Sequence, residues 1–150
     1  MEDILINFGY FGLFGISFVA ATLFPLGSEA AVVLLTASGW NPLGIFLSAT
    51  LGNVLGAFVN YGVGRIGDRF VLSRFVVADA GWKGRAERIF SSWGAPVLFF
   101  AWAPVIGDPL TVVAGVFRIN LFVFTIWVTA GKSFRYWLLI LAGETLPGFF

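Results

Sequence analysis

Four ionisable side chains lie in stretches of sequence that are otherwise apolar: Glu29, Asp108, Lys132 and Arg135. Glu29 is the only charged residue between positions 4 and 64. A carboxylate at the depth of a lipid bilayer costs about 2.5–3.5 kcal/mol on insertion scales, so it must be protonated, paired with a cation or hydrated. Ionisable residues in such places usually serve transport or proton movement. The sequence therefore predicts a proton or substrate site that includes Glu29.

Lys132 and Arg135 lie three residues apart in the last apolar stretch, so a helix would place both on one face. Two cations at that depth need carboxylates or an anionic ligand nearby. Arginine binds phosphate in a bidentate manner and lysine acts as a point charge, so a lipid phosphate would suit the pair. We therefore expect both cations to line one cavity with Glu29, Asp108 and the midspan amide Asn53.

Structural roles would also explain these residues. Glu29 and Asp108 each stand at the start of a short apolar segment, where a carboxylate caps a helix or favours its dipole. Lys132 and Arg135 would then belong to a structural ion-pair network. Asn53 would serve helix packing through an interhelical hydrogen bond.

The composition excludes several other classes of protein. The chain has 150 residues, of which 59% are hydrophobic and 11% charged, whereas soluble domains have about 25% charged residues. It lacks His and Cys, which excludes thiol nucleophiles, Ser-His triads, disulfides and the usual zinc sites. A net charge of +1 gives no sign of a nucleic-acid partner. We expect an all-α polytopic membrane protein that is not an enzyme, has no metal or organic cofactor and has membrane lipids as partners; a homo-oligomer stays open.

Proline and glycine interrupt the apolar sequence at two corresponding places. Residues 43–64 and 119–143 are each long enough to span a bilayer. The segments 30–39 and 110–117 are too short and follow the interruptions, so we expect each to form part of a re-entrant helical hairpin. The residues that make the interruptions are Pro25, Gly27, Pro104, Gly107 and Pro109.

The two halves of the chain resemble each other. When the first half is shifted by 79 positions, Glu29 falls on Asp108 and Asn53 falls on Lys132. The identical pairs are Gly15 and Gly94, Pro25 and Pro104, Val33 and Val112, Asn41 and Asn120, Thr50 and Thr129, Gly52 and Gly131, and Gly64 and Gly143. Each half would cross the membrane an odd number of times, so the second half would be inverted. We predict one domain over residues 1–150, with repeat 1 at about 5–64 and repeat 2 at about 89–143.

The loop 65–88 between the repeats carries six of the nine basic residues, which places it in the cytoplasm. Arg118 would return to the same side and anchor the chain at the membrane interface. Residues 82–93, with Trp at both ends, are predicted as an interfacial helix. Residues 4–24 are also long enough to span, so whether they span or form half of a hairpin stays open.

Several motifs, taken together and in order, resemble the YqaA-type branch of the DedA/VTT superfamily of membrane proteins over about residues 15–140. They are Pro25-Leu26-Gly27-Ser28-Glu29, Ala49-Thr50-Leu51-Gly52-Asn53-Val54-Leu55-Gly56, Gly64-Arg65, Trp102-Ala103-Pro104-Val105-Ile106-Gly107-Asp108, Ala114-Gly115-Val116-Phe117-Arg118-Ile119 and Gly131-Lys132-Ser133-Phe134-Arg135-Tyr136. The resemblance implies facing re-entrant helices, inverted repeats, a bacterial inner-membrane location and a role in lipid handling. Superfamily members are linked to flipping undecaprenyl phosphate or scrambling phospholipids, and some are thought to use the proton motive force.

The second break departs from the better-known DedA pattern. DedA proteins carry arginines around it, whereas this chain has Ala101 and Trp102 before the break and Asp108 within it. The phosphate-binding arginines therefore do not carry over there, and Lys132 and Arg135 would supply the charge from the next helix. We expect a transporter or flippase of a lipid or small anion, with proton coupling. The alternative is a non-transporting scaffold held together by its ion pairs.

Overall fold

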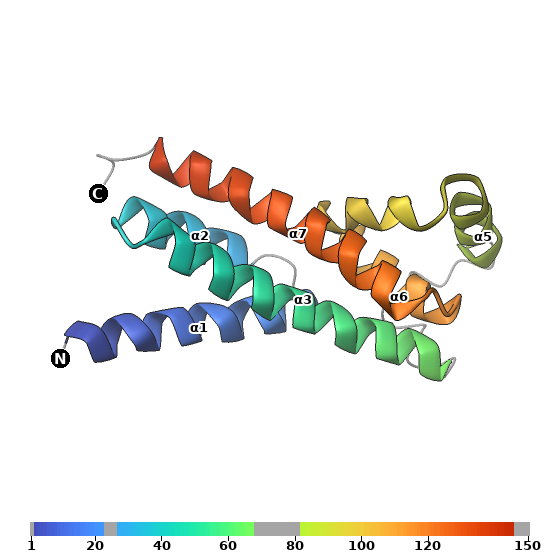
Figure 1. Ribbon diagram of the computed structural model, residues 1–150, viewed down its shortest axis with the longest axis horizontal. Helices are drawn as coiled ribbons and strands as arrows, with labels where there is room; N and C mark the ends of the chain where they lie inside the picture. Colours follow the sequence, from blue (N-terminus) through green and yellow to red (C-terminus); the bar gives the residue numbers. More distant parts are fainter. Residues whose placement is uncertain (1, 23–26, 68–81, 146–150) are drawn as a thin grey trace. The chain divides into compact units, whose positions relative to one another are not determined.

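Helices make up all of the secondary structure in the part of the chain that the computed structural model describes, which is residues 2–22, 27–67 and 82–145 (Figure 1). The elements are α1 (Glu2–Thr22), α2 (Gly27–Ala37), α3 (Pro42–Ile66), α5 (Trp82–Trp93), the 3-10 helix η1 (Ala95–Trp102), α6 (Gly107–Val116) and α7 (Leu121–Glu144). The predicted all-α class is confirmed for these residues. Pro25 and residues 68–81 of the predicted cytoplasmic loop lie outside them.

The two long helices, α3 and α7, begin with the same cap. Asn41 Oδ1 accepts hydrogen bonds from the backbone N–H groups of Leu43 at 2.9 Å and Gly44 at 3.4 Å. Asn120 Oδ1 accepts from the corresponding N–H groups at the start of α7, again at 2.9 and 3.4 Å. Asparagine is among the best N-cap residues because its side-chain oxygen satisfies the free N–H groups of the first turn. The caps fix where both long helices start.

The two short helices, α2 and α6, end in the same way. After α2, the N–H of Gly39 bonds to Thr36 O at 3.0 Å and the N–H of Trp40 bonds to Leu35 O at 3.1 Å. After α6, Arg118 and Ile119 make the equivalent pair of bonds, at 3.0 and 3.1 Å. This pattern is the Schellman motif, in which the residue just after the C-cap adopts a positive φ. Gly39 has φ 79° and Arg118 has φ 53°.

The short helices begin earlier than the sequence predicts. The prediction started them at residues 30 and 110, whereas α2 starts at Gly27 and α6 at Gly107. The first four N–H groups of a helix have no intrahelical acceptor, so Pro109, which lacks an N–H, fits inside the first turn of α6. Glu29 and Asp108 consequently lie within the first turns of these helices.

A separate short helix lies between the predicted interfacial helix and the second break. α5 covers residues 82–93 as expected, and η1 follows as a separate 3-10 helix. Gly94, with φ 65°, makes the turn between them, and Pro96 lies at the start of η1. An eight-residue 3-10 helix is long for its kind, because its hydrogen bonds are poorer than those of an α-helix.

The chain forms two compact units, and each unit takes one part of α3 and one part of α7. Unit 1 comprises residues 1–56 and 132–150, and unit 2 comprises residues 57–131. In unit 1, α1 and α2 pack together, and the core contains Leu13, Val32, Ile45, Ala49, Tyr136 and Ile140, drawn from all four of its helices. The core of unit 2 contains Ala57, Tyr61, Leu98, Ala101, Ala114, Phe124 and Val128.

Among the described helices, α3 alone is long and apolar enough to cross a membrane by length and composition. α7 has 24 residues, which at about 1.5 Å each exceed the roughly 30 Å of a hydrocarbon core, but it carries Lys132, Arg135 and Glu144. The 11 residues of α2 and the 10 of α6 are too few to cross.

Candidate functional site

Unit 1 contains an ion pair between two helices. Arg135, on α7, donates a hydrogen bond to Oε1 of Glu29, which lies in the first turn of α2. The Arg135 side chain is 9% exposed and that of Glu29 is 29% exposed. The N-terminal turn of α2 also favours the carboxylate through the helix dipole. The pair therefore joins α2 to α7 while one of its partners stays accessible.

A second polar contact lies one turn earlier on α7. The Lys132 ammonium, which is 0% exposed, donates to Asn53 Oδ1 on α3. The Asn53 amide in turn donates to the carbonyl of Ser17 on α1 at 3.0 Å. Lys132 and Arg135 share a face of α7 because they are three residues apart. Three helices thus meet around Asn53.

Tyr136 adds a contact that the sequence analysis missed. Its hydroxyl donates to Ser28 Oγ at 3.0 Å, and both side chains are buried. Tyr136 follows Arg135, and Ser28 precedes Glu29, so the bond lies beside the ion pair. Because α7 and α2 contact each other at Arg135 and Glu29, the adjacent residues Tyr136 and Ser28 also lie close together. A predicted ion pair therefore also predicts a contact between its sequence neighbours.

Asp108 belongs to unit 2. It lies in the first turn of α6, whose N-cap position is held by Ile106 without a side-chain hydrogen bond. The hydroxyl of Thr111 donates to the Asp108 carbonyl at 2.6 Å, and the Asn60 amide donates to Thr111 Oγ1 at 3.2 Å. Of the five predicted site residues, Glu29, Asn53, Lys132 and Arg135 gather in unit 1. The approach of Asp108 to them stays a prediction.

The predicted anchor Arg118 is exposed in the turn between α6 and α7. Nearby in unit 2, the Tyr61 hydroxyl donates to the Ile119 carbonyl at 2.6 Å, and Arg65 donates to Tyr61 Oη at 3.2 Å. These bonds tie the end of α3 to the turn after α6.

Glycines on α3 allow the close approach on which the unit 1 cluster depends. A Cβ added at Gly52 would overlap the Phe14 carbonyl oxygen of α1, and one at Gly56 would lie 2.8 Å from the Phe18 carbonyl oxygen. Any side chain at Gly52 would separate α1 from α3. Close packing of α1 against α3 at these glycines therefore accompanies the polar contact at Asn53.

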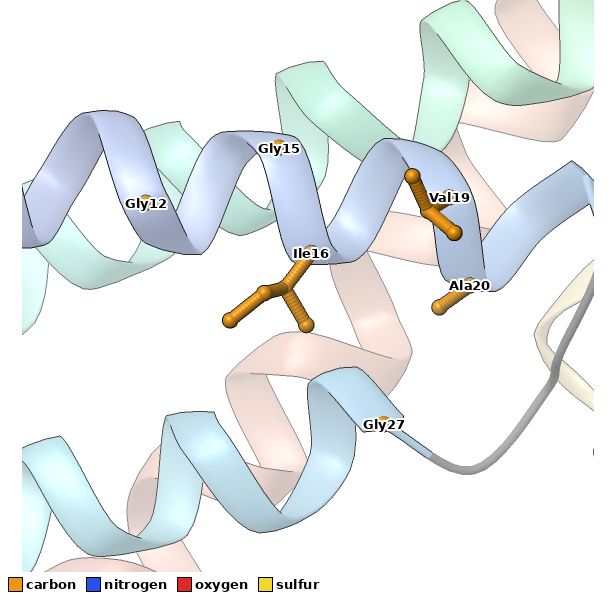
Figure 2. Close-up of a pocket in the computed structure, with 6 residues that line it drawn as sticks. All are labelled: Gly12, Gly15, Ile16, Val19, Ala20 and Gly27. Atoms are coloured by element: carbon orange, nitrogen blue, oxygen red, sulfur yellow. The ribbon is translucent and has the colours of Figure 1, made fainter.

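An apolar groove of about 440 Å³ runs between α1 and α2 (Figure 2). It is lined by Gly12, Gly15, Ile16, Val19, Ala20 and Gly27. A Cβ added at Gly12 or Gly15 would meet no protein atom within 4 Å. Gly27 also lies two residues before Glu29 on α2, so one end of the groove adjoins the helix turn that carries the ion pair.

The described residues contain no group of three acids that would hold a metal ion. The arrangement in unit 1 instead has two cations and one carboxylate around buried amide and hydroxyl groups, which suits ion pairing and anion attraction. An apolar helical chain that buries such charges among its helices has the character of a membrane protein.

Comparison with known proteins identifies the family. The chain is 36% identical to inner membrane protein YqaA of Escherichia coli over 139 residues, which cover 92% of each chain. It is 32% identical over 128 residues to a Haemophilus influenzae protein, covering 80% of this chain and 78% of that one. It is 30% identical to an alkaline phosphatase-like protein of Lactococcus lactis, covering 97% of this chain and 76% of that one.

The chain belongs to the YqaA branch of the DedA family of membrane proteins. The Escherichia coli relative is named as an inner membrane protein and not as an enzyme. No family model matches the chain. No solved structure matches it either.

Proposed function

We propose that this protein is a multi-pass transporter or flippase that moves an anionic lipid or a small anion across the bacterial inner membrane, coupled to protons. The observation that carries the proposal is the polar cluster of unit 1, in which Lys132 and Arg135 are buried beside Asn53 and Glu29. Charges at such depth are costly to keep unless they serve a function.

The ion pair suggests how coupling would work. An anion that reaches Arg135 would compete with Glu29 for the guanidinium, and Glu29 is the more exposed of the two side chains. A carboxylate that loses its cation at bilayer depth favours its protonated form. Anion binding would therefore bring a proton onto Glu29, and re-formation of the pair would release both. We propose Asp108 as the second proton carrier, in the corresponding position of the other repeat.

An inverted repeat of two re-entrant hairpins, α1–α2 and η1–α6, would supply the architecture. Three observations at the 79-residue offset support it: the Asn41 and Asn120 caps, the paired Schellman motifs, and the contact of Asn53 with Lys132. Transporters of this kind form their sites where interrupted helices meet near the midplane. The basic loop 65–88 would lie in the cytoplasm.

The apolar groove between α1 and α2 suits an acyl chain of a lipid substrate. Its lining is aliphatic, and Gly12 and Gly15 leave open space at its floor. Because Gly27 lines the groove two residues before Glu29, a chain lying there would hold its headgroup near the Glu29–Arg135 pair. We place the lipid tail in this groove.

The test is translocation of a fluorescent anionic phospholipid in proteoliposomes, with and without a proton gradient. Glu29→Ala and Asp108→Ala should each slow translocation at least about tenfold, while Glu87→Ala, at an exposed position of α5, should leave the rate unchanged. Equal rates for all four proteins at matched protein levels would reject the transport role of the two acids.

A scaffold function has its own supporting observation. Glu29, Asn53, Lys132 and Arg135 all make contacts within the chain, as a purely structural network would. A scaffold predicts that Glu29→Gln combined with Lys132→Met affects stability alone. A translocation defect in a well-folded double variant would reject the scaffold.

A further inference from the structure

Two hydroxyl groups in the interior of unit 1 lack hydrogen-bond partners among the residues that the structure describes. They are Ser17 Oγ, on a residue that is 0% exposed, and Thr50 Oγ1, on a residue that is 5% exposed. Buried hydroxyls in proteins are nearly always paired with protein groups or with ordered water. Two buried hydroxyls without a protein partner in one unit are therefore unusual.

Thr50 differs from two other threonines that lie inside helices of this chain. Thr36 donates to the Val32 carbonyl at 2.8 Å and Thr125 donates to the Leu121 carbonyl at 2.7 Å, each four residues earlier in its own helix. The same bond would satisfy Thr50 without any partner outside α3, and it is not made. Its hydroxyl remains available to another group.

Each hydroxyl belongs to a residue linked to Asn53, Ser17 through a backbone hydrogen bond and Thr50 through its position one turn earlier on α3. The Asn53 amide bonds to the backbone carbonyl of Ser17 at 3.0 Å. Thr50 precedes Asn53 by three residues and so shares its face of α3. Asn53 Oδ1 accepts from the Lys132 ammonium. The Asn53 amide thus contacts the residue that carries one unpaired hydroxyl and the buried cation, and the second unpaired hydroxyl belongs to the preceding turn of its own helix.

We propose that a buried water molecule binds at Ser17 and Thr50, beside the Asn53–Lys132 contact. Water can donate to one hydroxyl and accept from the other, and a buried water needs two to four such partners. A metal cation is disfavoured by the nearby ammonium. The water would give protons a polar step beside Lys132. That role rests on the proposed function, whereas the presence of the water rests on the two hydroxyls alone.

Thermal unfolding of Ser17→Ala, Thr50→Val and the double variant in detergent micelles tests the water. If one water binds both hydroxyls, each single variant leaves the water and the other hydroxyl short of a partner, so the midpoint falls by about 2–4 °C. The double variant removes both hydroxyls, so its fall should be clearly smaller than the sum. Thr50→Ser, which keeps the hydroxyl, should stay nearer to wild type than Thr50→Val.

The alternative, two hydroxyls with no partner at all, predicts the opposite sign. Removing an unsatisfied buried hydroxyl stabilises a protein, so both single variants would raise the midpoint and their effects would add. That outcome would overturn the proposal. Thr36→Val is the control for loss of a buried hydroxyl whose partner is known. Because unfolding needs no transport activity, a protein that fails to translocate lipid still tests the water site.

Discussion

Lys132 donates a hydrogen bond to Asn53, and 79 residues separate the two. The same separation relates Glu29 to Asp108 and the cap Asn41 to the cap Asn120. Two positions related by a two-fold rotation contact each other only near the rotation axis, as in an isologous interface. An inverted repeat would therefore place Asn53 and Lys132 on its axis. Since one is an amide and the other a cation, the two repeats would differ in charge at the axis.

Breaking the Glu29–Arg135 pair should destabilise the protein more than deleting it. Glu29→Gln leaves the buried Arg135 guanidinium without its carboxylate, at a cost of about 3–5 kcal/mol. Arg135→Leu leaves a carboxylate that is 29% exposed without its cation, so its cost should be smaller. The double variant should recover a large part of that loss, because neither side then retains an unpaired charge. Unfolding free energies in detergent measure the cycle. Strictly additive single effects would show that the two side chains do not depend on each other.

Gly52→Ala should destabilise the protein by about 1–3 kcal/mol, because the added methyl group overlaps the Phe14 carbonyl oxygen and must push α1 away from α3. Gly62→Ala is the matched control on the same helix, since its Cβ meets no atom within 4 Å. The control should be neutral or stabilising by about 0.5–1 kcal/mol through helix propensity. Comparable melting temperatures for the two variants would argue against close α1–α3 packing.

Arg118→Gly should stabilise the protein by up to about 1 kcal/mol, since Arg118 adopts φ 53° at a position that favours glycine. Gly39→Ala, at the corresponding turn after α2 with φ 79°, should lose a similar amount. Chemical unfolding of both variants measures the two effects, which should have opposite signs. A loss on Arg118→Gly would mean that the side chain contributes more as an anchor than its backbone costs.

A Cβ at Gly12 or Gly15 would meet no protein atom within 4 Å, so Gly12→Leu and Gly15→Leu should add apolar volume to the groove between α1 and α2 without a clash at the Cβ (Figure 2). If a lipid tail lies there, phospholipid translocation should fall at least about fivefold while the melting temperature changes little. Gly62→Leu places the same side chain in open space away from the groove and should translocate normally. Undiminished translocation by both groove variants would place the lipid tail elsewhere.

The long helices were predictable from sequence to within two residues at each end. A long, mainly apolar run without proline and an Asn cap define the start and length of α3 and α7 locally, so their boundaries depend little on tertiary contacts. The short helices were harder, because Pro109 and Gly27 were assigned to the interruptions before the helices, and here they lie in the first turns of α6 and α2. η1 was not predicted, since its 3-10 geometry depends on the Gly94 turn.

The candidate site was predictable in its charges and not in its hydroxyls. Glu29 and Arg135 are opposite charges in apolar surroundings, and the cost of burying either alone favours their meeting. Ser17, Thr50 and Tyr136 carry no comparable signal, because hydroxyls are common on helix faces and their importance depends on which neighbour the fold supplies.

The division of α7 between the two units has a consequence for biosynthesis. The core of unit 1 needs Tyr136 and Ile140, which the ribosome adds long after Leu13, Val32 and Ile45 have left it. Arg135 follows Glu29 by 106 residues, so the carboxylate is synthesised well before its cation exists. The nascent chain must therefore hold Glu29 without its cation until α7 is made, and the contact between α2 and α7 at this ion pair can form only then.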